Sequence, residues 1–361
     1  MSKFVYFPLI KTRDAELRAF QNLSSEVMEQ ILPIYELTKS RTTKKAPDGD
    51  IHRRMRQICE IQDGRPFILD LSTDNKYINP QIEQLVSPYD GFKDWQYFLN
   101  LYKELNIIPM VHLYEADDDD EDGSTFKEVE SFVANISKVK SQIAVRLPHD
   151  LSSSDYKYYL EPIIHSLQNE CKLIVLLDAN FVSEDAQSDV ADIVDPLILS
   201  AKEVLDLDGF DKIEDVVMLC TSFPSSPAKA GNEDAEGKFK ILEENIYQGV
   251  IEEVNIKYGD YASINTQQIE MKGGTFVPRI DIALEDGYSF IYKRYRRNDG
   301  SYPRCAKSML IDSEYSNLDT WADSEILLAS EDTPTGISPS FWISVRMVYY
   351  INTRVNLRNS D

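Results

Sequence analysis

Charged and polar side chains stand at the ends of several apolar runs, where they are suited to acid–base or anion-binding chemistry. The residues at or just beyond those ends are Lys11, Glu36, Asp70, His112 with Tyr114, Arg146, Asp178, Ser222 and Asp281. Carboxylates beside Lys and Arg orient anionic ligands, move protons or hold a metal through oxygen ligands. Polar residues also end strands without any function, so the set matters only if the fold brings its members together.

The apolar runs themselves predict strands that are buried on both faces. They are continuous and rich in Val, Ile and Leu rather than alternating, as parallel strands covered by helices are. The predicted strands span residues 4–10, 31–37, 67–71, 107–113, 143–147, 172–177, 216–220 and 276–284.

Amphipathic segments between these runs predict helices. The segment that begins at Ser124, for example, carries Phe126, Val129, Val133 and Ile136 at helical spacing. Eight strands separated by helices correspond to a (β/α)8, TIM-like barrel, which typically needs roughly 250 residues. A doubly wound open sheet is the alternative, but no Gly-rich turn follows the first strand. We therefore expect an α/β barrel with its chemistry at the carboxyl ends of the strands.

The last quarter of the chain has a different character. We expect residues 1–285 to form the barrel and residues 286–361 a C-terminal extension packed on it. Within the extension, the turn signal Asn298-Asp299-Gly300 between runs 288–297 and 302–311 predicts a β-hairpin. The apolar stretch 341–351 predicts a helix that covers the barrel.

The charge balance excludes some partners. The 361 residues include 38 Lys plus Arg and 61 Asp plus Glu, which gives a formal net charge of −23. Such a surface repels nucleic acid and anionic membranes, so bulk nucleic-acid binding is not expected. We find no apolar run that would span a bilayer and no secretory signal, and we expect a cytoplasmic protein. An acidic run, Asp117–Asp120, follows the fourth predicted strand and is interpreted as a solvated loop.

Several short motifs resemble the Beta-protein family of bacteria and phages. They are FVYFPLIK (4–11), ILPIYE (31–36), RPFILD (65–70), AVRL (144–147), LLD (176–178) and YGDY (258–261), followed by the late strands within 280–292. The resemblance implies one barrel-like domain with an elaborated C-terminus and a phage- or defence-related setting, without a settled activity. Near the C-terminus the family shows Trp and Arg followed by two His. Here Trp342 and Arg346 precede Tyr349-Tyr350, so chemistry that depends on those histidines is not expected.

We predict one pocket at the strand carboxyl ends. Lys11 and Arg146 would bind an anion, with Tyr261 and Tyr292 in the pocket wall. Three carboxylates, Glu36, Asp70 and Asp178, would act as acid, base or metal ligands, and a divalent cation is a candidate cofactor.

Two classes of function fit these predictions. The first is an enzyme or sensor that acts on a small phosphorylated or nucleotide-like compound. The second is a non-catalytic, acidic interaction module that binds a protein partner in a defence or anti-defence complex. A pocket favours the first, and stable co-purification with a partner favours the second.

Overall fold

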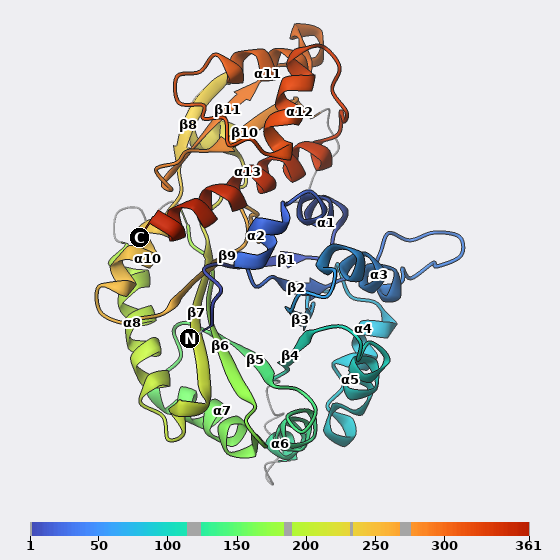
Figure 1. The fold of residues 1–361 in the computed structure, drawn as a ribbon, viewed down its shortest axis with the longest axis vertical. Coiled ribbons are helices and arrows are strands. Elements are labelled where there is room, and N and C mark those ends of the chain that lie inside the picture. Colours follow the sequence, from blue (N-terminus) through green and yellow to red (C-terminus); the bar gives the residue numbers. More distant parts are fainter. Residues whose placement is uncertain (1, 114–123, 184–189, 232–233, 268–275, 361) are drawn as a thin grey trace.

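Eight parallel strands close into a barrel in the computed structural model (Figure 1). The structure describes residues 2–113, 124–183, 190–231, 234–267 and 276–360. Around the barrel the strand order is β1-β2-β3-β4-β5-β6-β7-β9. Their bounds are β1 Phe7–Lys11, β2 Ile34–Leu37, β3 Phe67–Leu71, β4 Ile107–Val111, β5 Gln142–Pro148, β6 Lys172–Phe181, β7 Ile213–Thr221 and β9 Lys257–Asp260. The predicted TIM-like α/β barrel is confirmed.

Alternate residues of each strand fill the barrel, because successive side chains of a strand point to opposite faces. The interior forms its own apolar cluster, which includes Phe7, Leu9, Ile34, Ile68, Met110, Ala144, Leu176 and Leu219. The residues between them belong to a second, larger core that lies under the surrounding helices. Burial on both faces explains why these strands are continuous apolar runs.

The helices that follow the strands surround the barrel (Figure 1). They are α1 Asp14–Gln21, α2 Ser25–Gln30, α3 Ile51–Gln62, α4 Pro80–Leu85, α5 Tyr89–Leu101, α6 Ser124–Ile136, α7 Ser153–Ser166, α8 Ala191–Leu205 and α10 Glu243–Ile251. The short α9 Pro227–Ala230 packs instead on the strand β8 (Glu236–Lys240) of a separate small sheet. Ser152 caps α7 in a capping box with Asp155, as the serine-rich sequence there favours. None of the described helices combines the length and the apolar character that crossing a membrane requires.

The prediction of the eighth barrel strand at 276–284 is wrong. That segment contains β10 (Arg279–Ala283), which pairs antiparallel with β11 (Ser289–Arg294) in a separate sheet. The third strand of this small sheet is β8 (Glu236–Lys240). The barrel is closed instead by β9, which pairs with β1 and β7.

The C-terminal region is more helical than the sequence predicts. The second half of the expected hairpin, 302–311, is the helix α11 (Ser301–Leu310), and the hairpin of the structure is β10–β11. Two more helices follow, α12 (Trp321–Ser330) and α13 (Pro339–Ser360). The predicted helix over 341–351 is confirmed as part of α13, which packs against both α1 and β10 (Figure 1). The domain boundary at 285 stays a prediction, and it falls between two paired strands.

Candidate functional site

A ring of polar side chains closes the carboxyl end of the barrel interior. In six strands the residue two positions beyond an interior apolar residue is ionisable: Lys11, Glu36, Asp70, His112, Arg146 and Asp178. Tyr261, directly after β9, is itself part of the interior cluster. Because Lys11 pairs in register with Glu36, and Glu36 with Asp70, these three side chains leave adjacent strands at the same height. The two-residue period of the strands therefore assembles the site.

Arg146 is the centre of the group. Its Nη2 lies 3.0 Å from Asp70 Oδ2, and its Nη1 lies 3.7 Å from Glu36 Oε2 and 3.8 Å from Asp178 Oδ2. No well-aligned hydrogen bond joins Arg146 to any described residue, and its side chain is 22% exposed. The carboxylates hold the pKa of Arg146 above its usual value despite its burial. Arg146 thus keeps N–H donors for a ligand while it is held in place by charge.

Glu36 stays ionised. Its Oε1 accepts hydrogen bonds from Lys11 Nζ and, at 2.7 Å, from Ser72 Oγ. Burial acts against the charged form, but Arg146 and Lys11 outweigh it and lower the pKa of Glu36. Lys11 also lies over the ring of Tyr77, with its Nζ 5.3 Å from the ring centre.

Asp70 behaves in the opposite way. Burial and the neighbouring Glu36 raise the pKa of Asp70 to about 6, although Arg146 opposes them. Its Oδ1 accepts only the N–H of Leu71, at 2.8 Å, and its Oδ2 has no hydrogen bond of good geometry among the described residues. Asp70 can therefore exchange a proton near neutral pH, which Glu36 cannot.

Asp178 and Tyr261 form the far side of the site. Tyr261 donates its hydroxyl to Asp178 Oδ2 at 2.6 Å, and the N–H of Asn180 donates to Asp178 Oδ1 at 2.8 Å. Burial and the charge of Asp178 raise the pKa of Tyr261 well above its usual value. Tyr261 is thus a hydrogen-bond donor at every physiological pH.

His112 belongs to this site, although the sequence analysis placed it only at a strand end. Its Nδ1 lies 3.9 Å from Asp70 Oδ1, and its buried Nε2 has no hydrogen-bond partner among the described residues. Burial and the charge of Arg146 lower the pKa of His112 to about 3, so the ring is neutral. The sequence signal was its position two residues after the interior residue Met110.

A cavity of about 550 Å³ opens above the ring. Five of the seven predicted site residues line it: Lys11, Glu36, Arg146, Asp178 and Tyr261. Much of the remaining wall comes from the loops after β3 and β5 and from the end of β6. The residues there are Thr73, Asp74, His149, Asp150 and Asn180. Asp70 lies beneath, 3% exposed, in contact with Arg146. The volume suits a small-molecule ligand.

Tyr292 lies elsewhere. It is in β11 of the small sheet, fully buried, and its hydroxyl is 3.4 Å from the carbonyl oxygen of Ala228. Its ring packs so closely on Gly231 and Gly237 that a Cβ at either glycine would overlap it. The structure therefore does not bring Tyr292 to the mouth of the barrel.

A metal centre finds no support among the described residues. No group of three or more His, Cys, Asp or Glu side chains within the described ranges is arranged to hold a metal ion. Glu36 and Asp70 instead face Lys11 and Arg146. The divalent cation stays a prediction.

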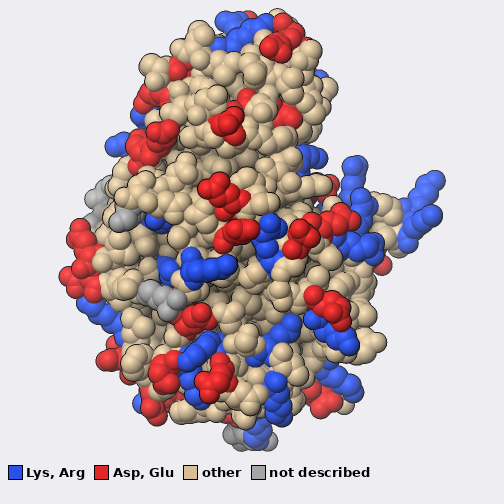
Figure 2. All heavy atoms as spheres, viewed as in Figure 1, with Lys and Arg blue, Asp and Glu red and all other residues tan. Residues whose placement is uncertain are grey.

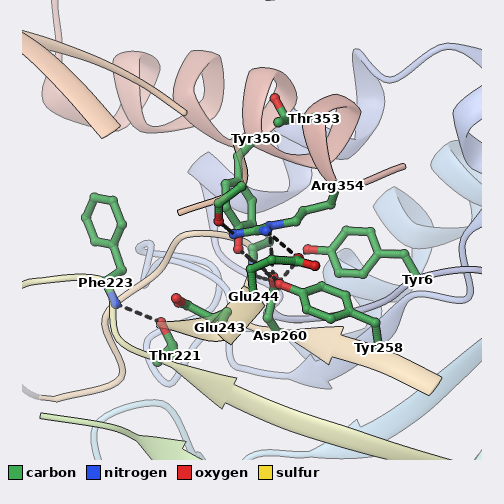
Figure 3. Close-up of polar contacts among 12 residues, drawn as sticks. Tyr6, Thr221, Phe223, Glu243, Glu244, Tyr258, Asp260, Tyr350, Thr353 and Arg354 are labelled. Carbon is green, nitrogen blue, oxygen red and sulfur yellow. Dashed lines mark hydrogen bonds and ion pairs between the residues drawn. The ribbon is translucent and has the colours of Figure 1, made fainter. Parts of the chain in front are cut away.

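A second buried polar group, which we call the Asp260 cluster, lies outside the barrel wall (Figure 3). It consists of Tyr6, Tyr258, Asp260, Tyr350 and Arg354. The three tyrosine hydroxyls donate to the carboxylate of Asp260, two of them at 2.6 Å, and the N–H of the following Ala262 donates at 2.7 Å. Tyr350 stands where the family resemblance placed a histidine. Because Tyr350 and Arg354 come from α13, this cluster fastens α13 to the barrel.

Fold and site together define a TIM-like barrel protein with a buried cluster of ionisable side chains at its mouth. A family model described as Beta protein matches residues 6–356. The chain belongs to this Beta protein family. It is also similar to Protein beta of Enterobacteria phage P4, with 27% identity over 357 residues that cover 98% of this chain and 94% of the phage protein.

Proposed function

We propose that the barrel mouth binds a small phosphorylated or nucleotide-like ligand and catalyses proton transfer on it. The observation that carries this proposal is the contrast between two neighbouring carboxyls. The pKa of Asp70 is raised to about 6 while that of Glu36 is lowered, beneath a cavity of ligand size. Neighbouring carboxyls whose surroundings push their pKa values apart are typical of acid–base active sites.

Each side chain of the site has its own role in this proposal. Lys11 and Arg146, whose side chains are 20% and 22% exposed, bind the anionic group. Asp70 donates or accepts the proton, and Glu36 keeps Lys11 and Arg146 in place. Asp178 orients Tyr261, which donates a hydrogen bond.

The comparisons support a phage-associated function at a coarser level. The family and the similarity to a phage protein span nearly the whole chain, so they concern the barrel and its C-terminal elements together. A role in defence belongs to our proposal.

Ligand-induced stabilisation tests the proposal. Thermal melting of the full chain is measured with inorganic phosphate, nucleoside mono-, di- and triphosphates and divalent ions. We expect at least one phosphate compound to raise the melting temperature, because a ligand that binds only the folded state stabilises it. Arg146→Met and Asp70→Asn should abolish that shift. Arg56→Met and Asp208→Asn, at side chains 65% and 89% exposed, are the matched controls and should keep it.

The two variants should differ in basal stability. Arg146→Met leaves three carboxylates without their shared cation, so it should unfold at lower temperature. Asp70→Asn removes a carboxyl that is unfavourably buried when ionised, so it should be as stable as the parent or more so. Strong destabilisation in both variants, with no shift of the parent by any compound, would favour a purely structural network.

The acidic interaction module stays the second candidate. Its sequence basis is the acidic surface together with the acidic loop 117–122, and this loop lies outside the described residues. Figure 2 shows acidic and basic side chains interspersed over the visible face rather than one continuous acidic area. Purification of the intact chain with a stable protein partner, together with no ligand response, would favour this candidate over the first.

A further inference from the structure

A second cavity, of about 310 Å³, shares no lining residue with the mouth of the barrel. It lies among the loops that follow β7 and β9, the strand β10 and the helices α11 and α13. Most of its wall is apolar or aromatic, and its large rings are Phe223, Phe276, Tyr302 and Trp342. Trp342 and Tyr302 stack on each other, with ring centres 4.9 Å apart and planes 16° apart.

The charge in this wall is unbalanced. Arg279 Nε donates to Asp281 Oδ1 at 2.6 Å, and Arg346 Nη1 donates to Asp281 Oδ2 at 3.2 Å. Asp281 thus serves two guanidinium groups. A third arginine of the wall, Arg13, pairs with Glu16, so three guanidinium groups face two carboxylates and one positive charge stays uncompensated in a protein of net charge −23. Arg346 is only 5% exposed. Its burial and the nearby Arg279 lower the pKa of Arg346 to about 10, although Asp281 opposes them.

Two side chains of the wall have hydrogen-bond donors without a partner among the described residues. The two terminal nitrogens of Arg279 make no hydrogen bond there, and neither does the hydroxyl of Tyr302. Arg346 lies over the ring of Phe223, with its guanidinium carbon 4.1 Å from the ring centre. The cavity therefore combines free donors, excess positive charge and aromatic walls.

We propose that this cavity is a binding site for a small anion that carries an aromatic ring, of the size of a mononucleotide. The anionic group would accept hydrogen bonds from Arg279 and Tyr302 and would supply the charge that Asp281 leaves uncompensated. The ring would pack in the apolar part of the wall. Small-molecule sites typically measure roughly 300–1,000 Å³, so a cavity of about 310 Å³ admits a ligand of that size but nothing much larger.

Isothermal titration calorimetry of the full chain with AMP, adenosine and inorganic phosphate tests the proposal. AMP should bind more tightly than adenosine or inorganic phosphate, because adenosine lacks the anionic group and phosphate lacks the aromatic ring. Arg279→Met should weaken the affinity for AMP roughly tenfold to a hundredfold, as the loss of a charge-assisted hydrogen bond does. Tyr302→Phe keeps the ring that stacks on Trp342 and should fold like the parent. It should weaken the affinity for AMP by a smaller factor than Arg279→Met does.

Two controls separate this site from other effects. Arg304→Met removes a guanidinium from α11 outside the cavity and should leave AMP binding unchanged. Arg56→Met, at a side chain 65% exposed and outside both cavities, should also retain it. No AMP binding to the parent, equal binding of phosphate and AMP, or unchanged binding in both Arg279→Met and Tyr302→Phe would overturn the proposal. Loss of binding in Arg146→Met alone would assign AMP to the mouth and likewise overturn it.

Discussion

Two carboxyls that pair in register on neighbouring strands, Glu36 and Asp70, have opposite pKa shifts. Their difference comes from their partners. Glu36 accepts from both Lys11 and Ser72, whereas Asp70 accepts a well-formed hydrogen bond, within the described part of the chain, only from the N–H of Leu71. A carboxylate that is buried without enough donors is destabilised relative to its protonated form. The strands position both groups equally, and the local donors decide which one can exchange a proton.

The pH dependence of the free energy of unfolding should reflect the raised pKa of Asp70. Its pKa is about 6 in the folded state and about 3.9 in the unfolded chain. A raised pKa stabilises the fold at pH values below the unfolded pKa, and this contribution is lost as the pH rises through the folded pKa. The parent should therefore lose about 2 kcal/mol relative to Asp70→Asn between about pH 4 and pH 7. Urea unfolding of both proteins across this range measures the difference, and parallel curves would contradict the assigned shift.

At the scale of elements, the Asp260 cluster explains how the C-terminal helix α13 is held against the barrel (Figure 3). Arg354 donates to Glu244 Oε2 at 2.9 Å and to the carbonyl oxygen of Gly287 at 2.8 Å, so it also joins α13 to α10 and to the turn after β10. All these side chains are buried, and buried polar groups stabilise a fold only when their hydrogen bonds are satisfied. The cluster thus specifies the position of α13.

Removing one donor from this cluster should have a moderate cost. Tyr350→Phe deletes the 2.6 Å hydrogen bond to Asp260 and keeps the ring. We expect the free energy of unfolding to fall by about 1–3 kcal/mol, because a charged acceptor loses a buried partner. Tyr97→Phe, at a side chain 70% exposed, is the control and should change stability by less than about 0.5 kcal/mol. Equal effects in urea unfolding would show that the cluster does not hold α13.

The closing strand of the barrel depends on Gly259. A Cβ there would lie 2.6 Å from Leu219 Cδ2 and 2.8 Å from the carbonyl oxygens of Met218 and Phe7. Backbone atoms of two adjoining strands cannot move away without breaking the ladder on either side of β9. Gly259→Ala should therefore destabilise the protein by about 2–3 kcal/mol. Urea unfolding measures this, and a stability equal to that of the parent would mean that β9 does not pack as closely as described.

At the scale of the whole molecule, the net charge of −23 acts on stability rather than on one site. Acidic side chains repel one another in the compact state, and salt screens this repulsion over about 10 Å at 0.1 M ionic strength. We expect the melting temperature to rise with added sodium chloride at constant pH. Potassium chloride at matched ionic strength is the control and should act equally. A melting temperature that falls with salt would show that attractive ion pairs outweigh the repulsion.

The sequence by itself determined the class of fold and most of the site. Continuous apolar runs and the polar residues at their ends are local features, and strand geometry alone brings Lys11, Glu36 and Arg146 to one end of a barrel. Tyr261 was found through the YGDY motif of the family. These features could be predicted because they depend on the two-residue period of a strand and not on its partners.

Only the tertiary structure decided which segment closes the barrel. The true eighth strand, β9, is just Lys257–Asp260, and its Gly259 and Asp260 disfavour a strand locally. It is stabilised by contacts from distant parts of the chain: Tyr6 and Tyr350 bind Asp260, and Leu219 packs on Gly259. The more apolar segment that contains β10 pairs with β11 instead, and this takes Tyr292 away from the mouth. Strand pairing and burial are properties of residues far apart in the sequence, so neither could be inferred from local pattern.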